Sequence, residues 1–142
     1  MADWLRMLTC SVHPLPYHAN PAEYFAAIRH APGAVLLDSG RPAAERGRYD
    51  LLSAWPLQEL TVGPSESGRE FLQRLRKNLN QLGNASLPAN YELPFAGGLI
   101  GYLSYDFGRR LEQLPARSRD DLQLPDEQLG LYAWALISDH QQ

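Results

Sequence analysis

The 142-residue chain has 44% hydrophobic and 20% charged residues, which is ordinary for a soluble globular protein and enough for one core. Its formal net charge is −3 and Lys77 is the only lysine, so the composition argues against a nucleic-acid binder that relies on a basic surface. A single cysteine excludes an intrachain disulfide, no apolar run is long enough to span a membrane, and no signal peptide is evident, so we expect one cytoplasmic domain over residues 1–142.

The first elements in the chain are a strand and a helix. Leu5–Val12 mixes β-branched and apolar residues, as strands do, and ends at a proline-rich turn. Asn20 as the cap, Pro21 at the first helical position and Glu23 three residues after the cap predict a helix that ends near His30. We expect this helix to bury Tyr24, Phe25 and Ile28.

Three further strands should follow. Ala34–Ser39 has the composition of a buried strand, and Gly40–Gly47 that of a loop. Arg48–Trp55 and Leu57–Val62 predict two more strands, separated only by Pro56. The links between these strands are short, which favours antiparallel pairing of neighbours.

The clearest helix begins at a capping box formed by Ser67 and Glu70 and ends at Gly83. Its apolar residues recur at three- and four-residue spacing and predict a buried stripe, with Leu72 on the flank: Phe71, Leu75, Leu79 and Leu82. Most of its basic residues lie off that stripe: Arg69, Arg74, Arg76 and Lys77. We interpret this charged face as solvated surface in preference to a phosphate site.

Residues 94–112 begin with an apolar run that contains three glycines. Gly97, Gly98 and Gly101 lack the spacing of a nucleotide-binding loop and indicate close packing of strands. We predict a strand through Tyr105 and then a short helix to Leu114, on which Asp106, Arg109 and Glu112 share one face. Three-residue spacing favours an ion-pair network over catalysis. The polar segment Arg117–Glu127 and one long last strand, Leu129–Ser138, complete the chain.

No catalytic or metal-binding constellation is evident, because the four histidines are scattered and no nucleophile motif occurs. One loop is more informative. If the strands before and after it pair, Ser39 would meet Arg46, Gly47, Arg48 and Tyr49, which together suit a small amphipathic anion such as an amino acid. The alternative is a solvated arginine-rich loop.

The pattern Gly-Gly-x-x-Gly-Tyr-x-x-Tyr-Asp-x-x-Arg-x-x-Glu resembles the anthranilate synthase/aminodeoxychorismate synthase component I family. Its residues here are Gly97, Gly98, Gly101, Tyr102, Tyr105, Asp106, Arg109 and Glu112. The run Tyr132–Ile137 before Asp139-His140 is more similar to the aminodeoxychorismate branch. The resemblance implies the N-terminal region of such an enzyme, which aminates chorismate with ammonia from a glutaminase component on the route to p-aminobenzoate and folate.

The resemblance further implies an α+β domain of mainly antiparallel sheet layers, with two main helices and one short helix, forming an incomplete half of a larger two-domain α/β sandwich. Mg²⁺ and the catalytic residues would lie in a C-terminal domain outside this chain, so we expect the chain alone to be inactive. A pocket for L-tryptophan would be formed by Ser39, Arg46, Gly47, Arg48 and Tyr49. The open alternatives are an anthranilate synthase component I and a stand-alone amino-acid-binding or interaction module. Without its partner domain the chain could self-associate through exposed apolar surface and strand edges.

Overall fold

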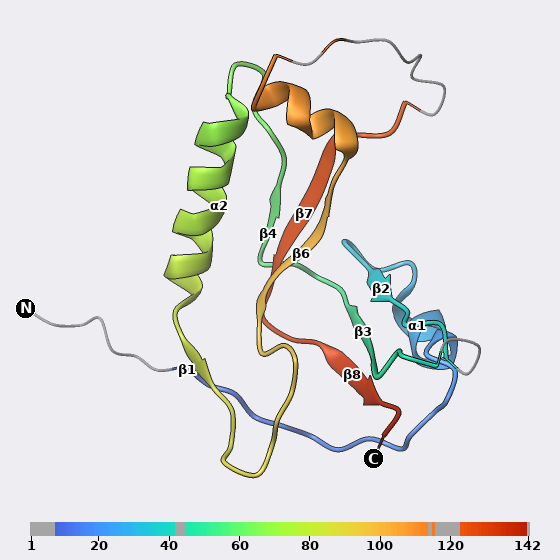
Figure 1. Cartoon of the computed structure of the whole chain (residues 1–142). Coiled ribbons are helices and arrows are strands. Elements are labelled where there is room, and N and C mark those ends of the chain that lie inside the picture. The colour runs from blue at the N-terminus through green and yellow to red at the C-terminus, as the bar shows by residue number, and fades with distance from the viewer. Residues whose placement is uncertain (1–7, 42–44, 114, 116–122, 142) are drawn as a thin grey trace, which may run out of the picture.

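The computed structural model describes residues 8–41, 45–113, 115 and 123–141, and over these residues it confirms an α+β fold. Two three-stranded antiparallel sheets, ordered β2-β3-β8 and β4-β7-β6, form the frame (Figure 1). The elements in chain order are β1 Leu8–Thr9, α1 Ala22–Ile28, β2 Val35–Leu37, β3 Tyr49–Ser53, β4 Gln58–Leu60, α2 Gly68–Leu82, β5 Ala85–Ser86, β6 Gly98–Leu103, the 3₁₀ helix η1 Tyr105–Arg110, β7 Glu127–Tyr132 and β8 Leu136–Asp139.

The two sheets share two chain segments that run antiparallel to each other. One continues from β3 into β4 and the other from β7 into β8 (Figure 1). Five residues (53–57) separate the paired parts of the first segment, but only four (132–135) separate those of the second. An extra residue on one strand bends the pair of strands, as in a β-bulge. Both segments therefore pass from one sheet to the other at this bend.

The single long strand expected at Leu129–Ser138 is therefore wrong, because it is two strands in two sheets. Likewise β3 and β4 do not pair with each other, although β2 and β3 pair antiparallel as expected. At the bend, Ser53 Oγ donates a hydrogen bond to the Trp134 carbonyl at 2.7 Å. Trp134 Nε1 donates to the Ala54 carbonyl at 2.8 Å, and these bonds satisfy polar groups that the broken ladder leaves free.

Helix α2 covers the β4-β7-β6 sheet, and its capping box is confirmed (Figure 1). Ser67 Oγ accepts from the Glu70 amide at 3.2 Å, and the Glu70 carboxylate accepts from the Ser67 amide at 2.8 Å. Phe71 and Leu75 are buried against Leu60, Leu131 and Phe107 in the larger core cluster. Leu79, expected in the same stripe, is instead 41% exposed, whereas Leu82 is half-buried and packs against the cluster.

Three other expectations need correction. Helix α1 buries no residue fully. Tyr24, Phe25 and Ile28 are only half-buried, because the helix lies at the rim of the β2-β3-β8 sheet (Figure 1). Strand β2 is likewise half-exposed, since it is an edge strand. The first strand is reduced to β1, which pairs with β5 in parallel, while Leu5 to Met7 lie outside the described residues.

The glycine run forms β6, and Gly101 shows why a side chain is excluded there. A Cβ at Gly101 would lie 2.0 Å from the Gln128 carbonyl oxygen on β7, and its φ is +154°. A Cβ at Gly97 would meet the Tyr132 carbonyl oxygen at 3.3 Å and Leu82 of α2 at 3.5 Å. The first close approach is therefore to the neighbouring strand, and the second also involves the helix layer.

The segment after β6 is a 3₁₀ helix that ends at Arg110, and not a longer helix to Leu114. Gly108 in its middle is a poor helix former, which favours a short element. Arg109 forms an ion pair with Asp106 at 2.9 Å, whereas Glu112 lies past the helix end and is exposed. Leu114 and residues 116–122 of the expected polar segment lie outside the described residues.

Candidate functional site

Ser39 and Gly47, predicted as neighbours in a ligand pocket, are in direct contact where β2 ends and β3 begins. A Cβ at Gly47 would lie 2.5 Å from Ser39 Cβ and 2.6 Å from Ser39 Oγ, so only glycine leaves room for the serine. Ser39 Oγ is buried and has no hydrogen-bond partner in the structure. A buried hydroxyl without a partner is costly unless something else supplies one, so this atom is a natural contact for a ligand.

The other predicted residues are arranged differently from the expectation. Arg48 forms a bidentate ion pair with Asp139 of β8, with Nη2 2.8 Å from Oδ2, and its guanidinium lies 4.6 Å from the centre of the Tyr49 ring. Asp139 thus takes up much of the hydrogen-bonding capacity of Arg48, and Arg48 covers one face of Tyr49. Arg46 is exposed.

A buried acid–histidine pair lies directly behind Ser39. Asp50 Oδ1 accepts a hydrogen bond from the Ser39 amide at 2.7 Å, and Asp50 Oδ2 lies 2.6 Å from His140 Nε2. The side chains of His140 and Asp50 are 4% and 2% exposed. His140 Nδ1 in turn lies 2.8 Å from the hydroxyl of Tyr17, which comes from the segment before α1. A chain of hydrogen bonds therefore links Ser39 to the surface.

The environment of Asp50 keeps it ionised. Burial by itself would raise the pKa of Asp50, but hydrogen bonds from the Ser39 amide and from His140 outweigh burial and lower that pKa below its ordinary value. The nearby Ser39 hydroxyl also favours the carboxylate, although its oxygen makes no hydrogen bond of acceptable geometry. Because Asp50 is an acceptor, His140 Nε2 carries a hydrogen.

A cavity of about 200 Å³ opens beside this pair, lined by Tyr17, Ala19, Arg41 and His140. Arg41 Nε donates a hydrogen bond to the Gly47 carbonyl oxygen at 2.5 Å, so Arg41 is bonded to the residue that contacts Ser39. Arg41 therefore links the cavity to the Ser39–Gly47 contact, and the cavity wall has a guanidinium, an imidazole and a phenol. Among the described residues, none of the lining side chains is acidic.

Sequence reasoning missed four residues of this site: Tyr17, Arg41, Asp50 and His140. Asp50 and His140 lie 90 residues apart in the chain, and the strand register that pairs Tyr49 with Asp139 brings them together. The identities of these two residues do not reveal which positions of β3 and β8 are paired. Of the four, only Arg41 could have been proposed from the sequence, because it lies in the same predicted loop as Arg46.

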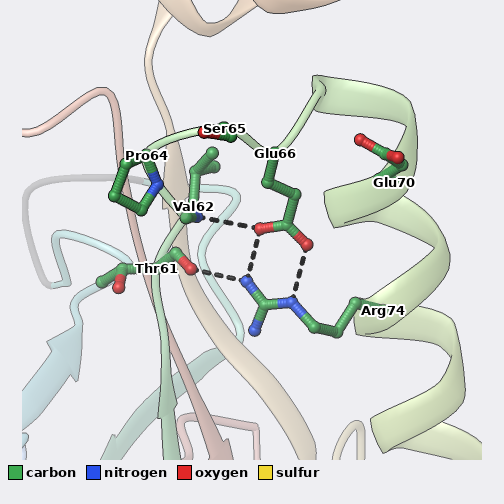
Figure 2. A pocket seen from close by; sticks show the side chains of 8 residues that line it. Thr61, Val62, Pro64, Ser65, Glu66, Glu70 and Arg74 are labelled. Atoms are coloured by element: carbon green, nitrogen blue, oxygen red, sulfur yellow. Dashed lines mark hydrogen bonds and ion pairs between the residues drawn. The ribbon is translucent and has the colours of Figure 1, made fainter.

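A second hollow, of about 650 Å³ and open to solvent, lies between the β4–α2 loop and the first turns of α2 (Figure 2). Two of its charged lining residues, Glu66 and Arg74, are paired with each other. Arg74 Nε and Nη2 bond Glu66 at 2.8 and 2.7 Å, and Nη2 also bonds the Thr61 carbonyl at 2.6 Å (Figure 2). These bonds, with one from the Gly63 amide, lower the pKa of Glu66 to about 2. This arrangement fastens a loop to a helix, and Glu70, the remaining charged lining residue, accepts hydrogen bonds from Ser67.

Within residues 8–41, 45–113, 115 and 123–141, no three histidine, cysteine, aspartate or glutamate side chains are grouped so as to hold a metal ion. Across the same part of the chain, none of the helices has the length and apolar character needed to cross a membrane.

Comparison with known proteins finds relatives over nearly the whole chain. It is 38% identical to aminodeoxychorismate synthase component 1 of Salmonella typhimurium and 37% identical to that of Escherichia coli, in each case over 96% of this chain and 33% of the relative. It is also 32% identical, over 82% of the chain and 25% of the relative, to anthranilate synthase component 1 of Mycobacterium tuberculosis. No family model matches. The chain spans about a third of the length of the aminodeoxychorismate synthase relatives it matches.

Proposed function

Because this chain is a relative of the component 1 proteins of aminodeoxychorismate synthase and anthranilate synthase, we propose that it is the N-terminal third of an aminodeoxychorismate synthase component 1. The observation that supports this choice is the similarity to three aminodeoxychorismate synthase relatives, at 37–38% identity over 95–96% of the chain, against 32–33% over 82% for the anthranilate synthase relatives. The aminodeoxychorismate synthase component 1 of Bacillus subtilis, at 32% over 76%, does not share in this difference. The full-length protein would then convert chorismate and ammonia to 4-amino-4-deoxychorismate, and the ammonia would come from a glutaminase component.

The reaction itself belongs, in this proposal, to the two thirds of the relatives that lie outside the match. The described residues provide no donor set that fits Mg²⁺, so we assign the ion, which the resemblance implies, to that remaining part. This chain would provide a layer against which that part packs, together with a ligand pocket. We therefore expect no turnover from the 142-residue chain alone.

The test is a product assay on the full-length protein that contains this chain, supplied with chorismate, Mg²⁺ and ammonium chloride. The expected product, separated chromatographically and identified by mass, is 4-amino-4-deoxychorismate. Release of anthranilate would assign the protein to the second enzyme class, and turnover by the 142-residue chain alone would contradict the division of labour. Activity with glutamine only after addition of a glutaminase component would support the proposed partner.

For the pocket we propose L-tryptophan as the ligand, held by Ser39, Arg46, Gly47, Arg48 and Tyr49. The contact between Ser39 and Gly47 and the unpaired Ser39 hydroxyl support a ligand at this place. The pairing of Arg48 with Asp139 is a difficulty, because the ligand would have to share or displace that partner. We expect part of the indole surface to be covered by residues outside this chain.

Isothermal titration calorimetry with L-tryptophan checks this. Full burial of an indole of about 150–250 Å² contributes roughly 4–6 kcal/mol before the cost of association, so half a pocket should bind far more weakly. We expect binding to the full-length protein, and weak or undetectable binding to the 142-residue chain. Micromolar or tighter binding to the short chain would contradict the shared pocket, and Ser39→Ala should weaken binding to the full-length protein while the exposed Ser65→Ala should not.

A further inference from the structure

The cavity beside His140 combines three groups that complement a carboxylate. Arg41, Tyr17 and His140 form most of its wall, and Ala19 completes it. Among the described residues Arg41 makes one hydrogen bond, from Nε to the Gly47 carbonyl, so its two Nη groups keep their donors. A guanidinium with two adjacent free donors pairs with a carboxylate through two parallel hydrogen bonds.

The charges around the cavity have their own partners. Asp50 is paired with His140 and the Ser39 amide, and Asp139 is paired with Arg48. These two carboxylates are the acids nearest His140 on β3 and β8, and neither is a lining residue. With His140 neutral, Asp50 and Arg41 cancel locally; with His140 protonated, the same group carries one net positive charge.

Protonation of His140 also changes the direction of one hydrogen bond. A neutral His140 donates from Nε2 to Asp50, so Nδ1 accepts the hydrogen of the Tyr17 hydroxyl. A protonated His140 donates from Nδ1 as well, and the Tyr17 oxygen becomes the acceptor. The hydroxyl hydrogen is then released from His140 and can be donated into the cavity that Tyr17 lines.

We propose that the cavity between Tyr17 and Arg41 is a binding subsite for a carboxylate group, and that protonation of His140 strengthens it. Arg41 supplies two donors, Tyr17 supplies a third when His140 is protonated, and the added positive charge attracts the anion. Because a protonated His140 adds positive charge to the cavity wall, the affinity should rise as the pH falls. The cavity lies beside the proposed tryptophan pocket, but the inference rests on these groups alone and needs neither an indole nor chorismate.

The test is a nuclear magnetic resonance titration of the ¹⁵N-labelled 142-residue chain with sodium acetate, at constant ionic strength, at pH 5.5 and pH 8. Before each titration, the dispersion of the amide signals is used to check that the protein is folded. We expect acetate to shift the amide signals of Ala19, Arg41 and His140, with affinity about fivefold or more higher at pH 5.5, the lower end of usual coupling between two sites. Equal affinity at both pH values, or shifts spread evenly over the molecule, would overturn the proposal.

A second arginine, away from the cavity, provides a matched comparison. Arg41→Gln should weaken acetate binding about tenfold or more, because it removes the paired donors and the charge. Arg76→Gln removes one exposed positive charge from α2 and should leave the affinity unchanged. Equal losses in the two variants would reduce the effect to general electrostatic attraction and refute a built subsite.

His140→Gln keeps an amide donor near the position of Nε2 for Asp50 but cannot be protonated, so the difference between pH 5.5 and pH 8 should disappear. Tyr17→Phe is a second probe at the exposed end of the network, and Tyr17 is 55% exposed, so folding should survive. We expect Tyr17→Phe to weaken binding more at pH 5.5 than at pH 8. An unchanged pH dependence in the folded variants would exclude His140 as its source.

Discussion

Gly101 is the residue of the glycine run that tolerates a side chain least. Gly101→Ala would place a methyl group 2.0 Å from the Gln128 carbonyl oxygen and impose a φ of +154° on alanine. Overpacking and backbone strain each cost about 1–3 kcal/mol, so we expect the free energy of unfolding to fall by roughly 2–6 kcal/mol. Urea denaturation measures this change. Gly63→Ala is the control, since a Cβ there has its nearest neighbour at 3.5 Å and should alter stability by less than about 1 kcal/mol.

Glu66 makes the stability of the protein depend on acid. The hydrogen bonds from Arg74, and then from the Gly63 amide, lower the pKa of Glu66 in the folded protein from its ordinary value of 4.5 to about 2. Below pH 4.5 the unfolded chain takes up a proton at this site while the folded chain does not, so stability falls as the pH falls toward 2. Denaturation curves between pH 5 and 2 should show a flatter decline for Glu66→Gln than for wild type.

The exposed Glu59 is the matched control for this prediction, since Glu59→Gln should leave the decline unchanged. Part of the decline will persist in Glu66→Gln, because Arg48 and then the Gln141 amide lower the pKa of Asp139 against a smaller opposing effect of burial, and Ser67 lowers that of Glu70. A wild-type slope in Glu66→Gln would contradict the role given to the Glu66–Arg74 pair.

At the scale of single residues, local chemistry could predict the contact between Ser39 and Gly47 but not what lies behind it. Serine and glycine on facing strand ends are visible in the order of the chain. The pairing of Asp50 with His140 depends on the register of β3 against β8. Arg48 shows the same limit, since its partner Asp139 comes from the other end of the sequence.

Among the elements, α2 depends most clearly on a local signal. Ser67→Ala removes the hydroxyl that accepts from the Glu70 amide, which should destabilise the protein by about 1 kcal/mol. Thermal unfolding followed by circular dichroism measures the loss. Ser65→Ala changes an exposed serine of the same loop and should leave the melting temperature unchanged. Equal shifts in the two variants would show that the cap contributes nothing specific.

Elements set by local signals were predicted well, and elements set by distant contacts were not. The capping box, the apolar spacing and Gly83 define α2 within fifteen residues. Residues 129–138 instead look continuous, because an apolar run does not reveal a bend that depends on Trp55 and Ser53 across the ladder. The two-residue strand β5 has no periodic pattern at all, and it exists through its pairing with β1.

For the whole molecule, the bend between the sheets leaves aromatic surface exposed. Trp55 and Leu57 are 55% and 62% exposed, and the ring of Trp134 lies 6.2 Å from that of Trp55. Exposed apolar groups of this size favour association. We therefore predict concentration-dependent dimers of the 142-residue chain, measured by size-exclusion chromatography with light scattering. A monomeric mass at high concentration would count against this.

Trp55→Asn tests the location of that surface. Trp55 has a φ of +52°, which asparagine adopts more readily than tryptophan, so folding should be retained or improved. We expect Trp55→Asn to shift the equilibrium toward monomer. Leu15→Ser, at a residue 59% exposed elsewhere on the chain, should not. Loss of dimer in Leu15→Ser alone would move the contact away from the bend.

The separation of Asp50 and His140 by 90 positions in the chain also bears on how the protein is made. During synthesis, β3 leaves the ribosome long before its neighbour β8, and α2 can complete its turns in the interval because its contacts are local. The cavity wall closes only when β8 arrives, so Asp50 waits in water, ionised and unpaired, until then. The order of assembly is then α2 first, followed by both sheets and the ligand pocket once β7 and β8 have been made.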